Sequence, residues 1–72
     1  MSEDTETRHE LVRRLFCLLT LASEEAAMLA VKGQSPHPDL LRARTLAAAL
    51  HIVGERIEIV SQAIGELTRD IP

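Results

Sequence analysis

The side chains in this sequence that are best suited to chemistry are three histidines and two adjacent glutamates. His9, His37 and His51 are spread along the chain, and no two have the i, i+4 spacing with which a helix presents a pair of imidazoles to a metal ion. Glu24 and Glu25 are neighbours, so a helix would point them to different sides, where they cannot act together as general acid and base. The sequence also contains no nucleophile elbow and no phosphate-binding loop. We therefore predict no catalytic residue, no metal site and no cofactor, and the protein is not expected to be an enzyme.

The cysteine content and the apolar runs of the chain bear on its compartment. Cys17 has no second cysteine with which to form an intramolecular disulfide, so we interpret it as a small apolar side chain in a reducing cytosol. The N-terminus is acidic where a signal peptide would be basic, and the longest mainly apolar run, residues 15–22, is far shorter than the ~20 residues that span a bilayer. These features predict a soluble, cytoplasmic protein without a membrane partner.

The charge balance argues against nucleic acid as a partner. The 72 residues carry a formal net charge of −3 and the pI is about 5.5, whereas nucleic-acid-binding domains usually present a basic surface. The basic residues gather weakly in two groups, which are Arg8, Arg13 and Arg14, and then Lys32, Arg42 and Arg44. Acidic residues interleave with the first group and no aromatic residue accompanies the second, so a solvated helix face is the favoured interpretation of both.

Two stretches with helical periodicity must position every other side chain. In each stretch apolar residues recur at alternating spacings of three and four, which is typical of a helix that packs against another helix. They are Val12, Leu15, Leu19, Ala22, Ala26 and Leu29 in the first stretch and Ala43, Leu46, Leu50, Val53, Ile57, Val60 and Ile64 in the second, and we call them the seam. If the chain reverses at Pro36, Leu19 meets Val53, and three pairs set a small side chain opposite a large one, as close packing requires: Ala22 with Leu50, Ala26 with Leu46 and Ala43 with Leu29. The sequence therefore predicts an all-α antiparallel two-helix hairpin.

A lone pair of helices of this size has little core with which to offset the conformational entropy lost on folding. Scaffolds this small usually need disulfides, a metal or association with another chain, and the first two are not expected here. We therefore predict that self-association or a partner completes the hairpin into a helical bundle.

The start of the first helix is predicted from its polar residues. Residues 1–6 are acidic, so we expect a flexible tail there, followed by a hairpin domain over residues 7–72. Thr7 and Glu10 fit a capping box, in which each side chain bonds the backbone N–H of the other. This signal places the first helix at residues 8–32.

The connection between the helices is predicted to be short. Gly33 would supply the left-handed conformation that commonly ends a helix. Pro38 would be the first residue of the second helix, where its missing N–H is tolerated, and this helix would extend over residues 38–70. A connection of about five residues forces the helices to be antiparallel neighbours.

One flank of this hairpin is predicted to remain apolar and uncovered. With Val12 and Leu50 at heptad position a, the g and c positions of both helices lie on the same side of the hairpin. The predicted partner-binding residues on this side are Leu11, Leu18, Leu21, Met28, Ala49, Ile52, Arg56, Ile59 and Ala63. Glu25 and Arg56 interrupt the apolar surface, and charges in such a place select register or partner more than they add affinity. An exposed apolar patch of this kind typically marks an interaction site.

Two further features point to contacts beyond the hairpin. Ile64 and Leu67 continue the seam where only Arg8 and Thr5 would lie opposite, so both are also predicted to bind a partner. A stripe of small residues beside the seam, Ala47, Gly54, Ser61 and Thr68, would let another helix or Phe16 approach closely. The alternative is that small residues are merely tolerated there.

The second helix resembles part of a known family. The residues that carry the resemblance are Ala49-Leu50, Ile57, Ile59 and Ala63-Ile64-Gly65-Glu66-Leu67, with Gly33 in the turn. Over residues 18–69 the chain is similar to the type III secretion needle-subunit co-chaperones of the YscE/PscE type. The resemblance implies a cytoplasmic helical hairpin that pairs with a repeat-type chaperone, so that together they keep the needle subunit from polymerising early.

A second class of function stays open from the sequence alone. The uncovered flank of one hairpin can close on its own copy, which gives a homodimeric, Rop-like four-helix bundle with a regulatory or RNA-binding role. Both hypotheses describe a small protein-interaction module. They differ in whether its partner is itself or a chaperone or secretion subunit.

Overall fold

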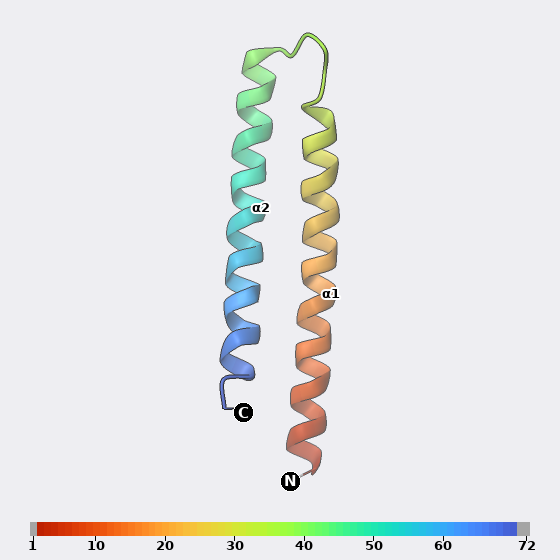
Figure 1. Ribbon diagram of the computed structural model, residues 1–72, viewed down its shortest axis with the longest axis vertical. Coiled ribbons are helices and arrows are strands. Elements are labelled where there is room, and N and C mark those ends of the chain that lie inside the picture. The colour runs from red at the N-terminus through yellow and green to blue at the C-terminus, as the bar shows by residue number, and fades with distance from the viewer. Residues whose placement is uncertain (1, 71–72) are drawn as a thin grey trace.

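The computed structural model describes residues 2–70, with side chains from Glu6 onward. Helix α1 (Ser2–Lys32) and helix α2 (Leu40–Leu67) lie side by side and antiparallel, with the turn at one end and the start of α1 and the end of α2 at the other (Figure 1). The described residues contain no strand. The predicted all-α helical hairpin is therefore confirmed.

The seam between the two helices is the whole core. Ala22 and Val53 are the buried apolar residues, with exposed fractions of 4% and 2%. The other seam residues are half-buried, and the two residues between successive seam positions are mostly exposed. This burial pattern is the one that the alternating spacing predicts, whereas the individual pairs such as Leu19 with Val53 stay predictions.

Helix α1 begins six residues earlier than its sequence signals indicate. It starts at Ser2, so the predicted start at residue 8 is wrong. Thr7 lies inside the helix, and the Glu10 carboxylate accepts hydrogen bonds from Arg13 and Arg14, so the capping box does not form. No glycine or proline interrupts residues 2–7, and acidic residues suit the positive end of a helix dipole, which explains the longer helix. Met1 lies outside the described residues, and the flexibility predicted for residues 1–6 stays a prediction.

Helix α1 ends by tightening its last turn. The Gly33 N–H donates to the Ala30 carbonyl at 3.1 Å and the Gln34 N–H donates to the Val31 carbonyl at 3.0 Å. These i to i−3 bonds satisfy the last carbonyls in the manner of a 3₁₀ turn. None of the described glycines has a positive φ, so the left-handed conformation predicted for Gly33 is wrong.

Helix α2 begins after an aspartate cap. Asp39 has extended backbone angles, φ −69° and ψ 117°, and its Oδ1 accepts a hydrogen bond from the Leu41 N–H at 3.0 Å. Pro38 therefore precedes the cap, and the prediction that it is the first helical residue is wrong. With Pro38 as the first helical residue His37 would be the cap, whereas Asp39 is the better cap because its carboxylate satisfies a backbone N–H that would otherwise lack a partner.

Helix α2 ends at Leu67, three residues before the predicted end at residue 70. The Thr68 N–H donates to the Ile64 carbonyl at 3.1 Å, and the Thr68 hydroxyl donates to the same carbonyl at 2.9 Å. Threonine side chains compete in this way for backbone acceptors, which favours termination of the helix at this residue.

The stripe of small residues does not create a close contact within the hairpin. A Cβ atom added at Gly54 would meet nothing within 4 Å, and Phe16 is 54% exposed. We expect Gly54→Ala to raise the free energy of unfolding by about 1 kcal/mol, because alanine has the higher helix propensity and fits without a clash. Thermal or urea unfolding followed by circular dichroism measures the change. Destabilisation by this substitution would mean that another chain packs closely against Gly54.

Candidate interaction surface

The apolar flank is exposed along most of the hairpin. We define it by the residues Leu11, Leu18, Leu21 and Met28 of α1 and Ala49, Ile52, Ile59 and Ala63 of α2. Its six large side chains have exposed fractions between 44%, at Leu11, and 65%, at Ile59. Ala49 and Ala63 are half-buried at its inner edge. The structure thus places these predicted residues on the surface, and their heptad positions place them on one side of the hairpin.

An ion pair crosses between the helices on this flank. Arg56 Nη1 of α2 lies 3.0 Å from Glu25 Oε2 of α1, and both side chains are about half exposed. The heptad pattern indicated both charges on this flank but was not used to predict that they pair. Their shared g edge is the signal that indicates the pair. An exposed ion pair adds ~1 kcal/mol or less to stability, but it leaves the middle of the apolar flank without net charge.

The turn end of the flank widens into a shallow hollow on α1. The hollow is lined by Ala27, Met28, Val31 and the stem of Lys32. Met28 and Val31 have exposed fractions of 63% and 65%. Methionine adapts to irregular partners because its side chain is unbranched and flexible, so this hollow extends the surface on which another helix can pack.

The open end of the hairpin is more covered than the flank. Ile64 and Leu67, which were predicted to bind a partner, are half-buried. Arg8 Nη1 pairs with Asp70 Oδ1 at 3.1 Å across this end. The structure therefore separates Ile64 and Leu67 from the exposed side chains of the flank, which offer more apolar area to another chain.

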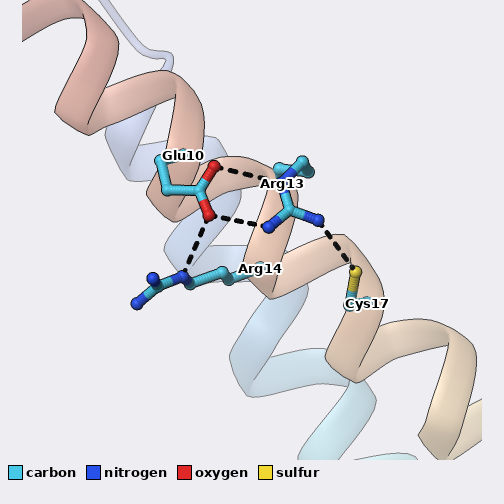
Figure 2. A network of polar contacts seen from close by, with 4 residues as sticks. All are labelled: Glu10, Arg13, Arg14 and Cys17. Atoms are coloured by element: carbon cyan, nitrogen blue, oxygen red, sulfur yellow. Dashed lines mark hydrogen bonds and ion pairs between the residues drawn. The ribbon is translucent and has the colours of Figure 1, made fainter.

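A group of polar side chains lies near the start of α1 (Figure 2). Glu10 Oε1 accepts hydrogen bonds from Arg13 Nη2 at 2.7 Å and from Arg14 Nε at 3.2 Å. Arg13 Nη1 also lies 3.9 Å from Cys17 Sγ, and Cys17 is exposed rather than a buried apolar filler. All four residues belong to neighbouring turns of one helix, so this is a surface network within α1.

Glu10 is expected to titrate well below an ordinary glutamate. Hydrogen bonds from Arg13 and then Arg14 lower the pKa of its carboxyl group from 4.5 to about 2. Because the pKa is lower in the folded state, the ionised carboxylate stabilises the fold fully above pH 4.5, and this contribution is lost as the pH falls toward 2. An NMR titration of the Glu10 carboxyl carbon at low salt measures the pKa. The variant Arg13→Gln with Arg14→Gln should return it toward the ordinary value, and an ordinary value in the unmodified protein would contradict the network.

The residues with metal-binding or catalytic chemistry do not converge. Among the described residues, no three side chains of His, Cys, Asp or Glu are placed to hold a metal ion. His51 Nε2 lies 2.9 Å from Glu55 Oε1 on the exposed side of α2, one helical turn away. Neither of the two described helices combines the length and apolarity that crossing a bilayer requires.

Comparison with known proteins adds no assignment. No family model, no curated protein and no solved structure matches this chain.

Proposed function

We propose that this protein is a non-enzymatic interaction module, which acts by packing its apolar flank against helices of another protein chain. The observation that carries the proposal is the exposure of six large apolar side chains on that flank. Contiguous apolar surface is costly to leave in water, and in small proteins it usually marks a binding site. The charge-paired Glu25 and Arg56 would then fix the register of the partner.

The weakness of the internal core supports this proposal. Ala22 and Val53 are buried within the hairpin, and the rest of the seam is only half-buried. A two-helix scaffold with so little buried apolar area is marginal by itself. Packing of the flank against further helices would supply the missing burial, so folding and binding are coupled.

The resemblance to type III secretion co-chaperones suggests one setting for such a module. In that setting the flank would pack against a repeat-type chaperone, and the pair would shield an aggregation-prone secretion subunit in the cytoplasm. A shielding role needs an apolar surface without net charge, which agrees with the flank and its paired Glu25 and Arg56. Nucleic acid is a poorer candidate, because the chain carries a net charge of −3.

An apolar fluorescent dye tests whether the flank is a binding surface. We expect the dilute chain to bind the dye, and the fluorescence to fall wherever association covers the flank. Leu18→Gln with Leu21→Gln should reduce dye binding at least by half. The matched control is Leu40→Gln with Leu41→Gln, since these leucines are 80% and 70% exposed but lie outside the flank. A monomer that binds no dye, or equal losses in both variants, would contradict the proposal.

A further inference from the structure

The hairpin exposes much more surface than a compact globular monomer of the same mass would expose. Its accessible surface is 5929 Å², whereas a compact monomer of this size exposes about 4,450 Å². Its radius of gyration is 16.8 Å against about 11 Å for a compact domain of this length. The excess is roughly 1,500 Å² per chain, so two chains that covered it would bury roughly 3,000 Å², which lies in the range of obligate homodimers.

From this area and the pattern of side chains along the flank, we infer that the partner is a second copy of the chain, packed flank to flank with its turn at the opposite end. The inference rests on the proposed function and names its partner. This arrangement has a two-fold axis that lies between the two flanks and is perpendicular to the helices. Across this axis α1 faces α1 of the second copy and α2 faces α2.

The flank of α1 matches itself in this orientation. With the axis at the level between Leu19 and Thr20, Leu11 faces Met28 of the second copy and Leu18 faces Leu21. In the same register Glu25 faces Arg14 of the second copy. In the single hairpin Arg14 pairs with Glu10 and Glu25 pairs with Arg56, and all four side chains stay at least partly exposed, so the contact between copies would join these pairs or exchange with them. A shift by one heptad in one direction would set Leu18 against Arg14, and a shift in the other direction would set Glu25 against Leu21. The register with the axis between Leu19 and Thr20 therefore best sets apolar side chains against each other and charges against opposite charges.

The second helix and the ends of the hairpin agree with the same orientation. At this axis Ile52 faces Ile52 of the second copy, so the two side chains at the centre of the α2 contact are apolar. The turn end carries Lys32 and Arg42, which are exposed on the flank side, whereas at the open end Glu66 pairs with Arg69 and Asp70 pairs with Arg8. Opposite orientation of the two copies keeps the two basic turn ends apart, whereas a parallel pairing would set basic end beside basic end.

Disulfide trapping distinguishes the two orientations. Single cysteines are introduced in a Cys17→Ser background of the full chain, and mild oxidation is followed by non-reducing electrophoresis. Ile52→Cys should form a covalent dimer with itself. Leu11→Cys mixed with Met28→Cys should form a mixed covalent dimer at least tenfold faster than either variant links to itself. Gln62→Cys, which lies away from the flank, is the matched control and should stay monomeric.

The cross-linking and sedimentation results together test the orientation of the two copies, the identity of the partner and the position of the interface. In a parallel pairing α1 would face α2 of the second copy, so a dimer in which neither Ile52→Cys links to itself nor Leu11→Cys links to Met28→Cys would overturn the inferred orientation. A chain that sediments at 8.0 kDa at all concentrations and still binds the apolar dye would overturn the second copy as partner, while the interaction surface itself would stand. A dimer that links only through Gln62→Cys would overturn both the inferred partner contact and the proposed surface.

Discussion

Replacing Ile52 and Ile59 with glutamate is expected to abolish association of the hairpin through its flank. These side chains are 58% and 65% exposed in the single chain, so the substitutions remove little burial within the hairpin. In an assembly each would lose apolar burial worth about 1.5–3 kcal/mol and would place a carboxylate where the partner must desolvate it. Since each 1.4 kcal/mol is a factor of ten, association should weaken at least a hundredfold.

Sedimentation equilibrium over a range of protein concentrations measures this change. The matched control is Gln62→Glu, which adds the same charge to an exposed position of α2 away from the flank and should leave association within about twofold. Helical circular dichroism of the separated variant should persist in part, because the seam is intact. Undiminished association of the double variant would exclude the flank as the interface and leave Ile64 and Leu67 as the better candidates.

The second large effect is expected at Val53, where aspartate should unfold the hairpin at neutral pH. Val53 has an exposed fraction of 2%, and no ion pair of the described residues lies in the seam beside it. Burying an ionised carboxylate without a partner costs several kcal/mol, which is comparable to the whole stability of so small a fold. The free energy of unfolding should therefore fall to about zero or below.

Circular dichroism as a function of pH tests the mechanism as well as the effect. Burial raises the pKa of a carboxyl group, so the destabilisation is largest above that raised pKa and is partly relieved as the pH falls below it. Gln62→Asp is the control, since it places the same carboxylate on the exposed side of the same helix. A folded Val53→Asp variant with unchanged helical content at pH 7 would show that the seam does not hold the structure together.

The two variants separate the two surfaces of the hairpin. The seam holds α1 against α2, whereas the flank is exposed to another chain. Val53 of the seam and Ile52 of the flank are adjacent in sequence but lie on these two different surfaces. Val53→Asp should therefore remove folding and binding together. Ile52→Glu with Ile59→Glu should remove binding and spare the hairpin, which makes the pair of results specific to this arrangement.

Periodicity and the short connection between the two helical stretches determined the architecture of this protein. Spacings of three and four define which face of each helix is apolar, and the short proline-containing connection leaves antiparallel packing as the solution. The exposed positions of Leu18, Ile52 and Ile59 also follow from the period, because a residue one position from a seam residue is turned by about 100° around the helix axis. These features depend on residues close together in sequence and repeat along each helix, so they can be predicted without knowing the tertiary structure.

The tertiary structure decided how the helix ends are capped and which charges pair. Thr7 and Gly33 carry typical cap signals that are not used, since Glu10 pairs instead with Arg13 and Arg14 and the last turn of α1 tightens by backbone bonds. A cap residue changes the stability of a helix by only about 1 kcal/mol, so other contacts of the same residues can override the cap that the sequence predicts. The Glu25–Arg56 and Arg8–Asp70 pairs join positions far apart in sequence, and only the relative placement of the two helices brings their charges within reach.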